Sequence, residues 1–227
     1  MTTTRAVVFD YFGTLTPTIV EMTTAAERIA LGGALGVDPA EFKAQWGASF
    51  VARSTGRTGD LTATLRAMAI ASGGAPTEDG LAEAVRIRSA VYRRAATPRP
   101  EAVDVLGSLK AGGLRVAVVS DCSLELVELW PELPVADVVD TPVFSAIVGR
   151  RKPAPEMYRT ACVGLDVEPA DCVYVGDGGS GELTGAAAFG MRPVLLADDD
   201  WAGGHRYDED TWAGPVIHRL ADVRTML

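Results

Sequence analysis

Several polar groups that could carry out phosphoryl transfer follow apolar segments of this chain. Asp10 comes directly after the apolar run 6–9 and enters a glycine turn. Ser120 and Asp121 end a second apolar run, and Asp177 follows a third at 172–176. The carboxyl ends of parallel strands meet at one edge of an open α/β sheet, which is where such sheets bind ligands. We therefore expect these groups to lie together, although an Asp before Gly-Thr is equally typical of a turn or a helix cap.

A lysine completes this set. Lys152 stands between prolines that keep its loop from becoming helical, and Lys43 and Lys110 are the only other lysines. Two aspartates can hold a divalent cation, a serine hydroxyl with backbone amides can hold anionic oxygens, and a lysine can offset charge. Asp10 and Asp177 would offer Mg²⁺ the one or two carboxylates it prefers, with one Asp10 oxygen left to attack phosphorus. A solvated loop lysine is the plainer alternative.

Composition excludes several classes of function. The 227 residues are 48% hydrophobic with a formal net charge of -9, and no basic stretch is dense enough to follow a nucleic-acid backbone. We expect no apolar run to cross a bilayer and no secretory leader before the first strand, so we predict a cytoplasmic protein. Cys122, Cys162 and Cys172 form no closely spaced metal-ligand pair and fit reduced, mostly packed thiols.

The periodicity predicts two domains. Residues 17–95 show helical spacing interrupted by glycines, with Asp38-Pro39 as a helix cap, and predict four or so short helices that form an inserted cap. Residues 1–16 and 96–227 predict an α/β core with a doubly wound, Rossmann-like parallel sheet. After the first strand, its expected elements are helices at 101–110, 156–164 and 183–189, and strands at 114–120, 172–175 and 193–196.

The order Asp10-x-x-Gly13-Thr14-Leu15, Ser120, Lys152-Pro153 and Gly176-Asp177, with Glu182 beyond, resembles the haloacid dehalogenase superfamily over nearly the whole chain. The resemblance implies that Asp10 is the nucleophile, Ser120 a phosphate ligand and Lys152 the charge-neutralising group. It also implies that Asp10, Asp177 and the Phe12 carbonyl bind Mg²⁺. Glu182 would then contact the Mg²⁺ ligands or reach the ion through a water molecule. We expect Gly13, Thr14 and Asp121 to lie around the phosphate as well. The helical insertion resembles the cap that closes over substrate in this family.

The sequence departs from the phosphatases of this family at Phe12, where they usually carry a second aspartate as general acid. General acid catalysis contributes about 10²–10⁴-fold, so its loss should slow alkyl phosphates most. Phe12 and Tyr158 resemble the 2-haloacid dehalogenase branch, in which Asp attacks carbon without a metal. Asp177 argues against that branch, which has neutral polar residues there. We expect Tyr158 to be a core or interface residue and Phe12 to pack against the cap.

Two other classes of function stay open. Residues 176–181 fit the G-x-G-x-x-G motif of a dinucleotide site, with Asp198–Asp200 as ribose ligands. The segment that follows is, however, too short for the second mononucleotide-binding half of such a fold. A non-catalytic binding protein would explain Phe12 but not Asp10, Lys152 and Asp177 together. Six cap arginines could recognise an anionic substrate or form a solvated face: Arg53, Arg57, Arg86, Arg88, Arg93 and Arg94. We expect His205 and His218 to be structural or exposed, and Trp201 and Trp212 to pack the C-terminal segment.

The sequence thus predicts a Mg²⁺-dependent phosphatase that hydrolyses a small phosphorylated metabolite through an aspartyl-phosphate at Asp10. The alternative is a metal-independent 2-haloacid dehalogenase-type hydrolase. We expect neither a nucleic acid nor a membrane as partner, and both a monomer and a homodimer fit the sequence.

Overall fold

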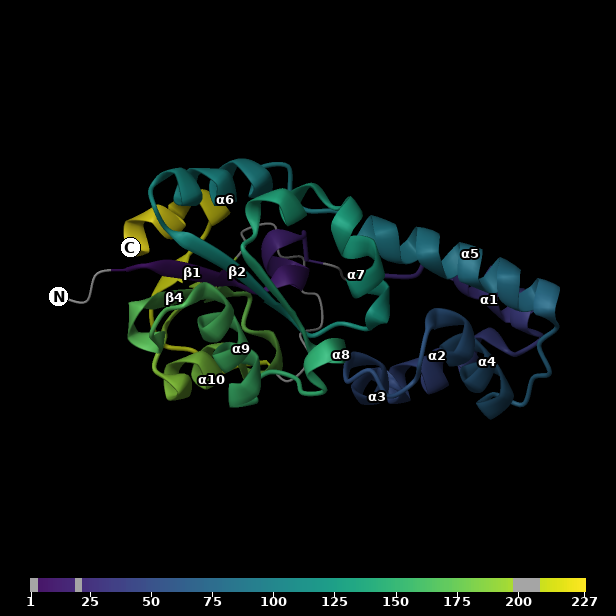
Figure 1. Ribbon diagram of the computed structural model, residues 1–227. Coiled ribbons are helices and arrows are strands. Elements are labelled where there is room, and N and C mark those ends of the chain that lie inside the picture. The colour runs from purple at the N-terminus through teal and green to yellow at the C-terminus, as the bar shows by residue number, and fades with distance from the viewer. Residues whose placement is uncertain (1–3, 19–21, 198–208) are drawn as a thin grey trace.

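The computed structural model describes residues 4–18, 22–197 and 209–227, and its centre is a parallel sheet in the order β3-β2-β1-β4-β5-β6 (Figure 1). The strands are β1 (Ala6–Phe9), β2 (Arg115–Ser120), β3 (Thr141–Phe144), β4 (Cys172–Gly176), β5 (Arg192–Leu196) and β6 (Val216–Ile217). The chain runs outward from β1 to β3, then returns beside β1 as β4. The strand order therefore reverses between β1 and β4, which is where open α/β sheets bind ligands.

The register brings the ends of the central strands level. Phe9 of β1 pairs with Val118 of β2 and with Val175 of β4. The backbone amide of Asp10 continues the pairing by donating to the Val175 carbonyl at 2.8 Å. Residues that follow β1, β2 and β4 consequently leave the sheet at one edge.

Helices cover both faces of the sheet and extend beyond its ligand-binding edge. They are α1 (Ala25–Leu35), α2 (Pro39–Ala48), α3 (Phe50–Ser54), α4 (Leu61–Ala71), α5 (Glu78–Ala95), α6 (Ala102–Ala111), α7 (Leu124–Leu129), α8 (Ser145–Val148), α9 (Pro155–Leu165) and α10 (Glu182–Phe189). Val7 and Phe9 face the side of α6 and the C-terminal turn 220–226, whereas Ala6 and Val8 face α9 and α10. This alternation follows from the two-residue period of a strand.

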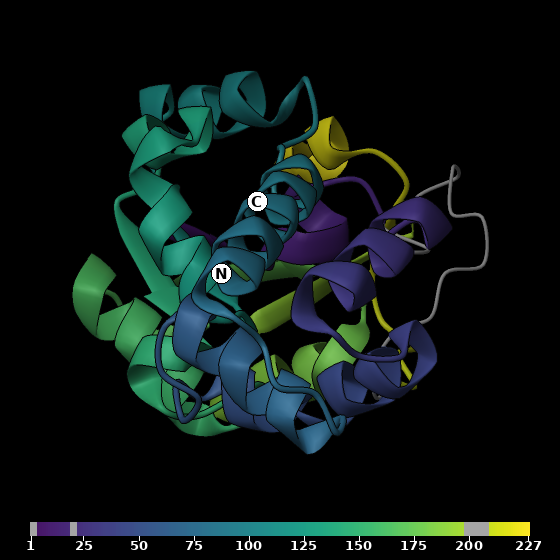
Figure 2. The same ribbon diagram turned by 90° about the vertical axis from the view of Figure 1, so that its right-hand side faces the viewer.

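Helices α1–α5 form a separate layer beside the core, and Figure 2 shows it in front of the sheet. Their apolar faces make a third cluster that contains Leu31, Leu35, Phe42, Leu65 and Leu81. Asp38 caps α2, because its Oδ1 accepts from the backbone amides of Ala40 and Glu41 at 2.9 and 3.1 Å. We call residues 25–95 the cap helices, and the domain division at 17–95 stays a prediction.

The predicted fold class is confirmed, and the predicted core elements agree with the structure to within one or two residues at their ends. Where four or so cap helices were expected, the described residues form five, α1–α5. The sequence analysis missed β3, β6, α7 and α8, which are short, and β3 also contains Pro142. Proline is tolerated there because β3 is an edge strand.

Other sequence predictions concern side chains outside the site. All three cysteines are buried thiols, and Trp212 packs the C-terminal segment with its indole donating to the Pro215 carbonyl at 3.1 Å. His218 is exposed. Asp198–Asp200, Trp201 and His205 lie outside the described residues. Within the described ranges, every helix is too short or too polar to traverse a lipid bilayer.

The cap helices are tied to the core by a buried ion pair. Arg88 of α5 donates to both carboxylate oxygens of Glu125 on α7, at 2.8 and 3.3 Å. Both side chains are buried, and the Ser123 hydroxyl adds a 2.8 Å bond to Glu125. A nearby aromatic contact joins the same layers, since Phe12 packs edge-on against Tyr92 of α5.

Replacement of Glu125 by Gln should destabilise the protein, because it leaves the Arg88 guanidinium buried without a countercharge. The expected loss is about 3 kcal/mol in the free energy of unfolding, measured by urea denaturation. The matched control is Glu128→Gln on the exposed side of α7. A double variant with leucine at positions 88 and 125 should be more stable than Glu125→Gln, and equal losses for Glu125→Gln and Glu128→Gln would contradict the role of the pair.

Candidate active site

Asp10 lies at the sheet edge with one oxygen bonded and the other facing no partner. Its side chain is buried, and Oδ1 accepts a hydrogen bond from Lys152 Nζ. Oδ2 has no hydrogen-bond partner within the part of the chain that the structure describes. Burial, opposed by the Lys152 ammonium and assisted by the Asp177 charge, raises the pKa of Asp10 to about 6. A buried carboxylate oxygen with nothing bound to it is suited to meet a cation or an electrophile.

Lys152 is held by a second carboxylate, Glu182. Lys152 Nζ donates to Glu182 Oε2 at 2.6 Å, and the Tyr174 hydroxyl donates to the same oxygen at 2.8 Å. The amide of Gly178 donates to Glu182 Oε1 at 2.9 Å. Although burial alone would lower the pKa of Lys152, the carboxylates of Asp10 and Glu182 raise it well above its usual value. Lys152 is therefore a fixed cation, and Glu182, with both oxygens engaged, positions it.

Asp177 completes a cluster of three carboxylates. One oxygen each from Asp10, Asp177 and Glu182 lie within 4.8 Å of one another. Three carboxyl groups face the single ammonium of Lys152, so acidic groups outnumber cations in this buried site, and burial, with the charges of Asp10 and Asp177, raises the pKa of Glu182 well above its usual value. Such an excess of acidic groups, presented by hard oxygen atoms, fits a divalent cation such as Mg²⁺. No described contact assigns the Phe12 carbonyl, and its role as a ligand stays a prediction.

Gly13 makes room for Asp177. Its backbone has φ +87°, which favours glycine, and a Cβ atom there would lie 2.5 Å from Asp177 Oδ2. The Gly13 amide already donates to Thr16 Oγ1 at 3.1 Å. The structure thus gives Gly13 a steric role beside the carboxylates, and its amide makes a hydrogen bond within its own turn.

Three buried hydroxyls near this edge have no hydrogen-bond partner in the described chain: Ser120 Oγ, Thr14 Oγ1 and Thr18 Oγ1. Ser120 ends β2, two residues beyond Val118, which pairs with Phe9, and it is fully buried. A buried hydroxyl without a hydrogen bond is unfavourable, and an anionic oxygen of a bound group would satisfy it. Ser120 is therefore suited to hold a phosphoryl oxygen.

Asp121 is engaged by the lysine loop. Its Oδ1 accepts from the Lys152 backbone amide at 2.9 Å, and Oδ2 lies 3.3 Å from Arg151 Nε. These contacts fix the loop that carries Lys152. They leave the Asp121 backbone, rather than its carboxylate, as the part suited to an anionic ligand.

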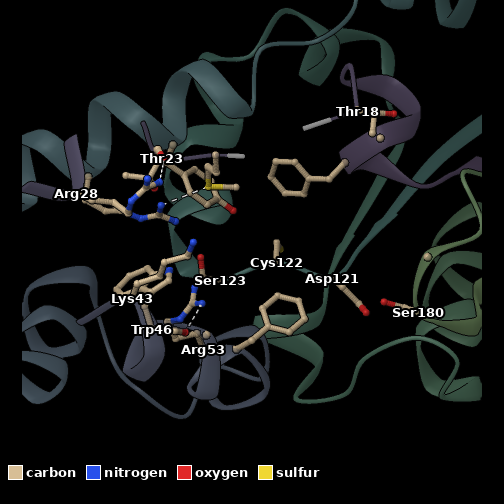
Figure 3. Close-up of a pocket in the computed structure, with 18 of the residues that line it drawn as sticks. Thr18, Thr23, Arg28, Lys43, Trp46, Arg53, Asp121, Cys122, Ser123 and Ser180 are labelled. Atoms are coloured by element: carbon tan, nitrogen blue, oxygen red, sulfur yellow. Dashed lines mark hydrogen bonds between the residues drawn. The ribbon is translucent and has the colours of Figure 1, made fainter. Parts of the chain in front are cut away.

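A cavity of about 600 Å³ lies between the core and the cap helices (Figure 3), and Ser120, Thr14 and Glu182 are buried behind its lining. Core residues Asp10, Lys152 and Asp177 line one end. The cap contributes aromatic rings to the lining, of which Phe50 contacts Arg151 and Tyr92 contacts Phe12: Phe42, Trp46, Phe50 and Tyr92. The sequence analysis missed Tyr174 and Arg151 as supports of the site. The only signal for Tyr174 was a hydroxyl in an apolar strand, which needs a buried partner.

The two aromatic residues that favoured a dehalogenase have structural contacts. Phe12 packs against the cap as predicted, with ring centroids 5.9 Å from Tyr92 and 5.2 Å from Tyr11. Tyr158 is buried, and its hydroxyl donates to the Glu182 carbonyl at 2.9 Å, which confirms its core location. The cavity lining contains Phe12 but not Tyr158.

The glycine-rich turn 176–181 is already occupied by a side chain of the protein. The Glu182 carboxylate accepts from the Gly178 amide, and a Cβ atom at Gly176 would collide with that carboxylate. A pyrophosphate would need those amides and would meet a buried negative charge. This arrangement argues against a dinucleotide site.

A family model described as haloacid dehalogenase-like hydrolase matches residues 4–190, a range that contains all of these groups. The chain belongs to this family of hydrolases. It is 31% identical over 98 residues to (S)-2-haloacid dehalogenase 1 from Pseudomonas sp. (strain CBS-3), covering 43% of each chain. It is also 31% identical over 99 residues to ribulose-1,5-bisphosphate 5-phosphatase from Halopiger xanaduensis, covering 43% of this chain and 41% of the relative.

The fold is similar to solved structures along the whole chain. The L-2-haloacid dehalogenase from Xanthobacter autotrophicus with chloropropionic acid covalently bound has a TM-score of 0.63 and 22% identity, covering 98% of both chains. The curated relatives match less completely, and the chain spans about half of their length or less. The comparisons therefore support the family and the fold. They do not separate the two activities, because a dehalogenase and a phosphatase are equally identical to this chain.

Loss of Asp177 should abolish Mg²⁺ binding. For the wild type, Mg²⁺ at 100 times its dissociation constant should raise the free energy of unfolding by about 2.7 kcal/mol, because the cation binds only the folded site. Asp177→Asn should lose both this stabilisation and the heat of Mg²⁺ binding in calorimetry. Asp137→Asn, an exposed aspartate, is the matched control. Equal Mg²⁺ binding by Asp177→Asn and the wild type would contradict the assignment.

Proposed function

We propose that this hydrolase is a Mg²⁺-dependent phosphatase that acts on a small phosphorylated metabolite. The observation that carries the proposal is the buried cluster of three carboxyl groups, Asp10, Asp177 and Glu182, around the single cation Lys152. A phosphate dianion would be repelled from this site unless a divalent cation were bound beside it. The buried thiols suit a reducing compartment such as the cytoplasm.

The chain's own groups account for the steps of the reaction. Mg²⁺, held by Asp10 and Asp177, would stabilise negative charge on the phosphoryl group. Ser120 and Lys152 bind and orient the phosphoryl oxygens. Asp10 Oδ2 attacks phosphorus, the bond from phosphorus to the ester oxygen breaks, and that oxygen leaves as an anion that takes its proton from solvent water. Water then attacks the aspartyl-phosphate, which releases inorganic phosphate and restores the Asp10 carboxylate.

A 2-haloacid dehalogenase-type reaction is the second candidate, and Phe12 is the observation that favours it. Phe12 lines the cavity where the phosphatases of this family carry an acid, and a dehalogenase is among the 31% identical relatives. In that reaction Asp10 would attack carbon and displace halide. Asp177 weighs against it, because a third buried carboxylate would repel an anionic haloacid.

Hydrolysis of p-nitrophenyl phosphate with Mg²⁺ or with EDTA tests the proposal, beside chloride release from 2-chloropropionate. Phosphate release should require Mg²⁺. Asp10→Asn should lower kcat by at least about 10³-fold, because it removes the nucleophile. Asp137→Asn again serves as the control. Chloride release in EDTA without phosphate release would refute the proposal in favour of the dehalogenase.

The aromatic residue at position 12 should make the rate depend steeply on the leaving group. Alkyl phosphates need a proton at the departing oxygen, and Phe12 has none to give. Phe12→Asp should therefore raise the ratio of alkyl to aryl phosphate kcat by about 10-fold or more. Phe12→Asn, which has a similar shape but no acid, is the control. An equal ratio in both variants would show that another group already protonates the leaving group.

A further inference from the structure

The cap end of the cavity is positively charged, in a protein of net charge -9. Four cationic side chains of the cap helices line it: Arg28, Lys43, Arg53 and Arg88. No carboxylate of the cap helices lines it within the described residues. The catalytic carboxylates lie at the opposite end, on the core side. Figure 3 shows Arg28, Lys43, Trp46 and Arg53 grouped on one side of the cavity, with Asp121 and Ser180 across from them.

The two buried arginines of this group differ in their partners. Arg88 is neutralised by Glu125 of the core. Arg53 is 8% exposed, and it donates to the Ser49 hydroxyl at 2.9 Å and to the Trp46 carbonyl at 3.0 Å. Both acceptors are neutral, and Arg53 forms no ion pair with a carboxylate in the described ranges. A buried charge is costly unless it is paired, and the Glu125 carboxylate, which raises the pKa of Arg53, already accepts its hydrogen bonds from Arg88.

The Arg53 guanidinium is held in place before any ligand binds. Its Cζ atom lies 4.0 Å from the centre of a Trp46 ring, and Arg88 Cζ lies 4.7 Å from the same ring. Burial, with the neighbouring Arg88 charge, lowers the pKa of Arg53 to about 10, which leaves it a cation at neutral pH. A fixed guanidinium loses little conformational entropy on binding an anion and suits the two oxygens of a carboxylate or phosphate.

We propose that Arg53 binds a second anionic group of the substrate, at the cap end of the cavity. This inference rests on the proposed phosphatase function, in which Ser120 and Lys152 bind the phosphoryl group that is transferred. The preferred substrates are then phosphate monoesters whose alcohol carries a carboxylate or another phosphate. Phe42, Trp46 and Phe50 line the same cavity and offer apolar surface to the carbon part of such a substrate.

A second cap arginine supplies a matched control. Arg57 lies one turn beyond Arg53, is exposed, and donates from Nε to the Thr55 hydroxyl at 2.9 Å. It does not line the cavity. Arg57→Gln removes one positive charge from the same region as Arg53→Gln. It therefore tests whether a general change of cap charge is sufficient to alter the substrate preference.

The experiment compares three aryl phosphates with the full-length enzyme and Mg²⁺. They are 4-carboxyphenyl phosphate, its neutral methyl ester, and 1,4-phenylene bisphosphate. The wild type should show kcat/KM at least about 10-fold higher for the two substrates with a second anionic group, as a charged hydrogen-bonded pair provides. Whichever of the two is preferred identifies a carboxylate or a phosphate as the natural second group.

Arg53→Gln should reduce this preference for a second anion by about 10- to 100-fold, Arg53→Lys should restore part of it, and Arg57→Gln should keep it. The inference would be overturned if wild-type kcat/KM were similar for the substrates with a second anionic group and for the neutral methyl ester. It would also be overturned if Arg53→Gln and Arg57→Gln changed this preference equally. The wild-type ratio needs no variant, so the test holds even if Arg53→Gln fails to fold.

Calorimetry separates this inference from the proposed function. The probes are 4-(phosphonomethyl)benzoate and its methyl ester, which are not hydrolysed. If no aryl phosphate is turned over, the phosphatase proposal fails, and tighter, Arg53-dependent binding of the free carboxylate still supports the cap site. If the neutral ester is hydrolysed with Mg²⁺ and the two probes bind equally, the phosphatase stands and the cap site is refuted.

Discussion

The active end of this molecule depends on the repulsion among three buried carboxylates and the single ammonium that holds them together. Asp10, Asp177 and Glu182 would separate if they were free in water. The sheet prevents this, because β1 and β4 are paired in register and end at the same level. Lys152 bridges Asp10 and Glu182, and the remaining charge favours a divalent cation. The site is therefore stable as a whole only when its positive charges are in place.

Several neighbouring groups hold these carboxyl groups and Lys152 in position. Asp121 fixes the backbone of the Lys152 loop, and Tyr174 and the Gly178 amide hold Glu182. Gly13 has no side chain where Asp177 needs space. The cap helices then cover the charged edge with aromatic rings, which lowers the local dielectric constant and strengthens each electrostatic interaction within the cavity. The side chains that pack around Lys152, Glu182 and Asp177 therefore also determine the electrostatic environment of these groups.

The sequence allowed the core and the charged groups to be predicted because both follow local rules. Strands of the parallel sheet are apolar runs, and their carboxyl ends share an edge, so the placement of Asp10, Ser120 and Asp177 follows from topology. Edge strand β3 was missed because it is short and contains Pro142. The roles of the cap arginines could not be predicted, since Arg53 and Arg57 look alike in sequence. Only the packing of Trp46 and Ser49 around Arg53 distinguishes a cavity residue from a solvated one.

The pairing of Arg88 with Glu125 has a consequence for how substrate preference could change. Glu125 belongs to the core helix α7 and does not line the cavity, yet it occupies a guanidinium that does. It acts as a resident anion that competes with any ligand for Arg88. The number of positive charges offered to a substrate is therefore controlled from outside the cavity. Changes in α7 could broaden or narrow the accepted anions in descendants of this enzyme while every residue of the cavity wall stayed the same.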